Sequence, residues 1–204
     1  MRTPILGLAM LAIAAPAVTS ATAEVPIGAL APDFTLADAA GKPVTLAAFK
    51  GKTVVLEWNN PGCPFVQKHY GSGNMQKTQR AAGAQGVVWL TINSGAPGKQ
   101  GHMNGTEAAA FVKAQKASPN AYLLDPEGKV GHLYAAKTTP HMYVIDPAGR
   151  LAYQGGIDDK PTANPADIAS ARNMVLAALG DMKAGRKVAV TESRAYGCTV
   201  KYAG

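Results

Sequence analysis

The middle of the chain alternates between apolar runs and polar stretches. Residues 53–58 and 86–92 are nearly continuous in apolar side chains, which is typical of strands buried on both faces of a sheet. The stretch between them, residues 67–85, is mostly polar and has no internal proline. These features predict a strand, a helix and a second strand.

Two hairpins are predicted on either side of this unit. Residues 34–46 alternate apolar and polar positions around Gly41-Lys42, which indicates a hairpin with a glycine turn. The second hairpin joins 142–145 to 151–154 through Asp146-Pro147-Ala148-Gly149. A short strand is predicted at 122–124.

Two further helices follow from composition and capping residues. The loop at 95–105 is rich in Gly and Pro, and the Ala-rich segment 106–116 after it favours a helix, which we interpret as an insertion between core elements. Asn164 has the character of an N-cap, with Pro165 at the first helical position, and predicts a helix that ends at Gly180.

The first 23 residues have the pattern of an export signal. A charged start precedes an apolar run from Ile5 to Val18, and Ala21-Thr22-Ala23 matches a small-residue cleavage site. We predict cleavage after Ala23, a periplasmic or secreted location, and no stable membrane insertion, because the apolar run is shorter than a spanning helix requires. The remaining chain is expected to form one domain, 24–184, with a tail, 185–204, that packs on it.

Charge and cysteine content narrow the function classes. The formal net charge is +7, but the basic residues are scattered and form no run interleaved with aromatics, so we predict no nucleic-acid partner. Two cysteines, Cys63 and Cys198, are too few for a disulfide scaffold. Each of them therefore requires its own explanation.

Cys63 is the strongest candidate for chemistry. A predicted strand ends at Trp58, a turn follows through Asn60-Pro61-Gly62, and Cys63 stands where the next helix begins. Unpaired backbone N–H groups and the helix dipole favour an anion there, so the thiol pKa should fall below its usual value of about 8.5. Cys63 is thus a candidate nucleophile, and a buried, unreactive cysteine is the alternative.

Five segments spread over the chain after residue 27 resemble the thioredoxin superfamily, in its redoxin or peroxiredoxin-like branch. They are Gly28-Ala29-Leu30-Ala31-Pro32-Asp33-Phe34, Phe49-Lys50-Gly51-Lys52, the turn at Cys63, Thr139-Pro140, and Val144-Ile145-Asp146 with Gly149. The resemblance implies an α/β, thioredoxin-like three-layer fold with an N-terminal β-hairpin extension and a helical insertion.

The resemblance also implies a site. Cys63 matches the first cysteine of the thioredoxin pair, whereas the second cysteine is replaced by Val66, so the ordinary dithiol motif is lacking. Pro140 matches the cis-proline that faces the active cysteine, with a trans proline at a strand edge as the alternative. The implied substrate groove consists of Asn60, Pro61, Gly62, Thr139 and Pro140.

Two peroxidase features are altered. Peroxiredoxins carry a Thr or Ser three residues before their cysteine and an Arg at the start of the later strand. This chain has Asn60 and Pro140 at those positions. The missing arginine argues against efficient peroxidase activity.

Cys198 lies in a tail that resembles the Gly-Cys-x-Val-Lys-Tyr ending of some peroxiredoxin-like proteins. This resemblance makes Cys198 a disulfide partner for Cys63. The bond would be either a resolving step in a redox cycle or a permanent staple that closes a long loop.

The histidines are less informative. His69 lies six residues beyond Cys63, about 240° around a helix, and is predicted to be a surface residue. His141 follows Pro140 and could approach Cys63 as a general base. We predict neither a metal nor a cofactor.

Three functions remain open. The first is an exported, thiol-dependent oxidoreductase that exchanges disulfides with protein or small-molecule thiols through Cys63 and Cys198. The second is a redoxin-fold binding module with a structural Cys63–Cys198 disulfide. The third is a weak thiol peroxidase.

Overall fold

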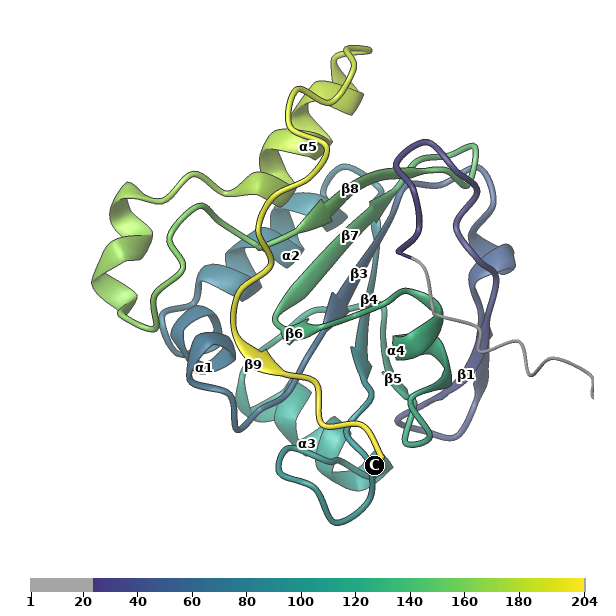
Figure 1. The fold of residues 1–204 in the computed structure, drawn as a ribbon, viewed down its shortest axis with the longest axis vertical. Helices are drawn as coiled ribbons and strands as arrows, with labels where there is room; N and C mark the ends of the chain where they lie inside the picture. Colours follow the sequence, from purple (N-terminus) through teal and green to yellow (C-terminus); the bar gives the residue numbers. More distant parts are fainter. Residues whose placement is uncertain (1–23, 204) are drawn as a thin grey trace, which may run out of the picture.

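A computed structural model describes residues 24–203 and shows a seven-stranded mixed sheet in the order β2-β1-β5-β4-β3-β7-β8 (Figure 1). β3 pairs in parallel with β4 and antiparallel with β7, so it lies inside the sheet. A separate pair is formed by β6 and β9. The strands are β1 Thr35–Asp38, β2 Pro43–Thr45, β3 Val54–Trp58, β4 Val88–Asn93, β5 Ala121–Leu124, β6 Thr138–Thr139, β7 His141–Ile145, β8 Leu151–Gly155 and β9 Cys198–Thr199.

Helices cover both faces of the sheet, which gives the three layers of a thioredoxin-like fold (Figure 1). Alternate side chains of β3 enter two hydrophobic clusters, Val55 on the side of α1, α2 and α5, and Leu56 on the side of α4. Every residue of β3 and β4 is buried, as predicted for central strands. The helices are α1 Pro64–Gly71, α2 Asn74–Gly83, α3 Gly105–Ala114, α4 Lys129–Leu133 and α5 Met174–Lys183, with 3-10 turns η1 Leu46–Phe49 and η2 Pro165–Ser170.

Both predicted hairpins, the two strands predicted at 53–58 and 86–92, and the helical insertion α3 are present. α3 begins one residue earlier than predicted, because Asn104 and Glu107 form a reciprocal capping box at its start. α4 and β6 were not predicted, since both are too short to show a periodic pattern.

Two predicted helices are each divided in the structure. The helix expected over 67–85 stops at Gly71, and Gly73 adopts a left-handed φ of 76° before α2 begins. The helix expected from Asn164 to Gly180 is the short η2, followed by extended backbone at Ala171 and a second start at Asn173. Asn173 caps α5 by accepting a hydrogen bond from the Leu176 N–H.

The predicted export signal, residues 1–23, lies outside the described residues. Across residues 24–203, none of the helices combines the length and the apolar character that crossing a membrane demands.

One acidic side chain of the strand that leads to Cys63 is enclosed in the core. Glu57 of β3 has no exposed surface. Burial raises the pKa of Glu57, and hydrogen bonds from Trp89 and Tyr70 partly offset this rise. Its carboxyl group accepts hydrogen bonds from Trp89 Nε1 at 2.8 Å, Tyr70 Oη at 2.8 Å, Thr91 Oγ1 at 3.0 Å and Asn59 Nδ2 at 3.2 Å.

This arrangement predicts that Glu57→Gln destabilises the fold. The substituted amide would present its own N–H groups to side chains that already donate, leaving at least one buried donor without an acceptor. We expect the free energy of unfolding to fall by about 1–3 kcal/mol in urea denaturation. Glu127→Gln, at an exposed position, is the control and should leave the free energy of unfolding essentially unchanged. Equal effects of the two substitutions would contradict the argument.

Candidate active site

Cys63 stands at the junction between β3 and α1. It is the N-cap residue of α1, with extended backbone, and Pro64 occupies the first helical position. The Cys63 N–H donates to the Asn60 carbonyl oxygen at 3.0 Å, which closes the turn after the strand. The thiol makes no capping hydrogen bond to the helix. It is therefore available for contacts with other parts of the chain.

The turn before Cys63 is held by an Asn side chain. Asn60 Oδ1 accepts from the Gly62 N–H at 2.9 Å, and Asn60 Nδ2 donates to Gln100 Oε1 at 3.0 Å. Gln100 belongs to the long loop before α3. Asn60, Pro61 and Gly62, predicted to line a substrate groove, thus form the turn itself, and Asn60 binds this loop.

The Cys63 thiol is enclosed on every side. It is completely buried, and Sγ donates to the Thr139 carbonyl oxygen at 3.0 Å. The Thr139–Pro140 peptide bond is cis, as the resemblance implied. The backbone N–H of Cys198 points at Cys63 Sγ with an N–S distance of 3.5 Å. The structure therefore brings Cys63, Thr139, Pro140 and Cys198 together.

Cys198 reaches this position through a short strand pair. β9 lies antiparallel to β6, with Cys198 opposite Thr139 and Thr199 opposite Thr138. In Figure 1 the tail runs along the molecule from α5 to this pair. Gly197, at a φ of 135°, lies so close to the Thr139 carbonyl that any side chain there would overlap it. Cys198 itself is partly exposed, and both cysteines are reduced thiols.

The pKa values of the two thiols are shifted in opposite directions. Burial raises the pKa of Cys63, but hydrogen bonds, chiefly from the Cys198 side chain and backbone, outweigh it, so the pKa is lowered overall. For Cys198, burial and the hydrogen bond to Cys63 raise the pKa to about 11. Cys63 is therefore the sulfur that carries negative charge more readily.

A buried charged cluster holds the tail just before Cys198. The Tyr196 hydroxyl donates to Asp158, lies 3.2 Å from His69 Nε2, and its ring packs on Phe65 at 5.8 Å. Lys68, also buried, places Nζ 3.5 Å from Asp158 Oδ2. We call Lys68, His69, Asp158 and Tyr196 the tail anchor.

The prediction that His69 is a surface residue is wrong. The side chain has no exposed surface, and the Asn74 amide lies 2.8 Å from Nδ1. Burial, reinforced by the neighbouring Lys68 but opposed by Asp158, lowers its pKa to about 4. The helix face away from Cys63 is covered here by the tail, which helical spacing alone does not reveal.

The other histidines make contacts unrelated to Cys63. His141 is buried and hydrogen bonded to the Tyr143 hydroxyl at 3.1 Å and to the Lys137 N–H at 3.4 Å. His132 stacks on Tyr202 at 4.0 Å. In the part of the chain that the structure describes, no three His, Cys, Asp or Glu side chains are grouped to hold a metal ion.

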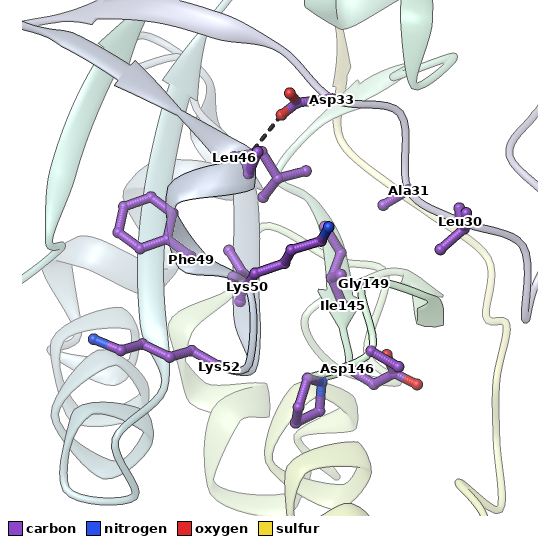
Figure 2. Close-up of a pocket in the computed structure, with 14 residues that line it drawn as sticks. Leu30, Ala31, Asp33, Leu46, Phe49, Lys50, Lys52, Ile145, Asp146 and Gly149 are labelled. Atoms are coloured by element: carbon purple, nitrogen blue, oxygen red, sulfur yellow. Dashed lines mark hydrogen bonds between the residues drawn. The ribbon is translucent and has the colours of Figure 1, made fainter.

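One cavity lies near the Cys63 thiol, and another lies far from it. A cavity of about 370 Å³ beside the active turn is lined by Pro61, Val66 and Phe111. Another, of about 270 Å³, lies between Leu30, Phe49 and Ile145 (Figure 2). The second cavity includes the first residue of β3, whereas Cys63 follows the last, so it is at the opposite end of the sheet.

Comparison with known proteins places this geometry in context. Residues 27–154 match the AhpC/TSA family. A hypothetical protein from Sinorhizobium meliloti 1021 has 27% identity and a TM-score of 0.74, covering 89% of this chain and 97% of its own. An uncharacterized conserved protein from Geobacillus kaustophilus has 24% identity and a TM-score of 0.73, covering 87% and 93%.

A third solved structure carries a functional name. A putative thiol:disulfide interchange protein, DsbE, from Chlorobium tepidum has 25% identity and a TM-score of 0.53, covering 64% of this chain and 85% of its own. No curated protein matches the sequence.

The close approach at Gly197 predicts that Gly197→Ala loosens the tail. The added methyl group would overlap the Thr139 carbonyl, so β9 would separate from β6. We expect Cys63 to be alkylated by iodoacetamide at least about tenfold faster, since each 1.4 kcal/mol of opening changes the exposed population tenfold.

The control is Gly185→Ala, which also has a positive φ but has open space around its Cα. This control shares the backbone strain without the overlap. Alkylation of Cys63 should keep the wild-type rate in Gly185→Ala. Equal rates in the two variants would show that the tail does not cover the thiol.

The lowered pKa of His69 predicts an acid-sensitive stability. Its folded pKa of about 4 lies below the unfolded value of about 6.5, so the unfolded chain binds more protons between these values. The stabilisation is complete above about pH 6.5 and is lost as the pH falls toward 4. Between pH 7 and pH 5 we expect His69 to account for about 1–2 kcal/mol of lost stability in urea denaturation.

His69→Gln provides the comparison, because it removes this titration. The variant should lose less stability than the wild type over the same interval, whatever its absolute stability at pH 7. Parallel curves for the two proteins would contradict the assignment.

Proposed function

Because the chain belongs to the AhpC/TSA family, we propose that it is an exported thiol-disulfide oxidoreductase whose working pair is Cys63 and Cys198. Both the AhpC/TSA family and the similarity to the solved structure named DsbE support a general redox function. The two named cysteines and the export are what the proposal adds.

The observation that carries the proposal is the position of Cys198 over Cys63. The Cys198 backbone N–H donates to Cys63 Sγ, with the nitrogen 3.5 Å from the sulfur. Residue 66, where a thioredoxin-type pair would place its second cysteine, is a buried valine in the hydrophobic cluster. The tail thus supplies a second sulfur that the helix lacks.

The chemistry requires no group beyond these sulfurs and a partner. Oxidation joins Cys63 Sγ to Cys198 Sγ and transfers two electrons and two protons to a partner disulfide, which becomes two thiols. The lowered pKa of Cys63 stabilises its thiolate and therefore the reduced form of the pair. Protein or small-molecule thiols and disulfides are the proposed partners.

The predicted export signal at residues 1–23 supports a periplasmic or secreted location, where disulfide exchange with other proteins takes place. In that compartment a protein with only two cysteines can cycle them without competing internal pairs. We propose cleavage after Ala23, which leaves Glu24 as the first residue.

A second candidate is a redoxin-fold binding module with a permanent Cys63–Cys198 staple. The complete burial of Cys63 and the hold of the tail anchor favour it, because a sealed disulfide resists exchange. Such a staple would close a loop of more than 100 residues and contribute roughly 4–5 kcal/mol in the chain-entropy model. The two candidates differ in the reduction potential of the bond.

The measurement that separates them is a redox titration of the purified mature protein. Alkylation with and without prior reduction, read by mass, gives the fraction of bonded cysteines at each ratio of reduced to oxidised glutathione. We expect a Cys63–Cys198 bond with a potential above about −250 mV. A potential below about −300 mV would support the staple, and two free thiols under mild oxidant would contradict both candidates.

Cys63→Ser and Cys198→Ser test whether the pair acts as a unit. Each single substitution should abolish multiple turnover in the reduction of a disulfide-bonded peptide, and should leave the unoxidised fold intact. Peroxide consumption no faster than that of a free thiol would exclude the weak peroxidase.

A further inference from the structure

We propose that the redox partner bonds to Cys198 and that Cys63 is the internal sulfur that leaves and returns. This inference rests on the proposed function and deepens it. It reverses the order that a nucleophilic cysteine at a helix start suggests, in which the partner bonds to Cys63 and the tail resolves.

An attacking thiol has better access to Cys198 than to Cys63. Cys63 has no exposed surface, with the Thr139 carbonyl 3.0 Å from its sulfur and the Cys198 N–H on another side. An attacking thiolate approaches a disulfide along the line of the sulfur–sulfur bond. At Cys63 that approach is filled by protein, whereas Cys198 is partly exposed and the next residue, Thr199, is exposed.

Contacts on both sides of Cys198 fix the tail over Cys63. Exposure of Cys63 requires β9 to leave β6 and separates the contacts on both sides of Cys198. Tyr196 is bound to Asp158 before it, and the Tyr202 hydroxyl donates to the Ala136 carbonyl at 2.7 Å after it. Exchange at Cys198 requires none of these contacts to break.

Cys63 is a better leaving group than Cys198. In thiol-disulfide exchange the sulfur with the lower thiol pKa leaves faster. The backbone N–H of Cys198, whose nitrogen lies 3.5 Å from Cys63 Sγ, lowers the pKa of Cys63 and remains a donor when the Cys198 sulfur is bonded to the partner. Attack on Cys198 therefore expels the better leaving group, in agreement with the direction that access allows.

The resulting step is balanced in atoms and electrons. A partner thiolate attacks Cys198 Sγ of the enzyme disulfide, the Cys63–Cys198 bond breaks, and Cys63 leaves as a thiolate. A second partner thiolate then attacks the partner sulfur of the mixed disulfide and releases Cys198. The partner's two thiols become one disulfide, and the enzyme disulfide is reduced by two electrons.

The experiment locates the mixed disulfide. The oxidised wild-type protein is mixed with glutathione, quenched in acid within milliseconds to seconds, alkylated and digested. Mass spectrometry should find glutathione on Cys198 in at least tenfold excess over Cys63. Glutathione mainly on Cys63 would overturn the inference.

Single-cysteine variants test the same point from the other direction. An aromatic disulfide, 5,5′-dithiobis(2-nitrobenzoate), should react with Cys198 in Cys63→Ser at least tenfold faster than with Cys63 in Cys198→Ser, after correction for the thiolate fraction at each pH. Adding Gly197→Ala to Cys198→Ser should accelerate Cys63 because the tail is loosened. Equal rates in the two single variants would contradict the order of attack.

The two proposals fail in different ways. If no Cys63–Cys198 bond forms under the glutathione titration, the proposed function itself is wrong. If the bond forms and cycles but glutathione is found on Cys63, only the order of attack is wrong.

Discussion

The pairing of β9 with β6 is the contact on which the candidate site depends. It places Cys198 opposite Thr139, whose carbonyl accepts the Cys63 thiol hydrogen bond. Without this pairing Cys63 would be a lone thiol at the start of α1, open to solvent at the strand-to-helix junction. With it, the thiol is buried, meets a second sulfur and has its pKa lowered by groups of the tail. Two short strands thus determine access, partner and acidity together.

For the short pair of β6 and β9, the pairing register decides whether Cys198 faces Cys63. A slip by one residue would turn the Cys198 side chain to the opposite face, because successive side chains of a strand alternate. A two-residue strand has too few backbone hydrogen bonds to fix its own register. The tail anchor supplies the missing constraint, since Tyr196 binds the buried Asp158. Buried polar groups of this kind contribute to a unique arrangement more than to net stability.

The sequence predicts features that depend on neighbouring residues, and it does not predict contacts between segments far apart in the chain. The central strands, both hairpins and the position of Cys63 follow from patterns within about ten residues, and the structure has them. His69 was misplaced because its burial depends on Tyr196, far along the chain. The tail anchor joins α1, the segment after β8 and the tail, and neither periodicity nor composition marks such a meeting. The break at Gly73 was visible as a glycine, but a single glycine does not by itself end a helix.

The replacement of the usual second cysteine links redox state to the tail. Val66 is buried within the hydrophobic cluster, so residue 66 serves packing and cannot take part in exchange. Any internal disulfide of Cys63 must therefore cross to the tail. The tail is held by β9, Gly197 and the tail anchor, and the proposed disulfide would add a covalent bond at the same place. Oxidation of the proposed pair would thus strengthen an attachment whose register is already set.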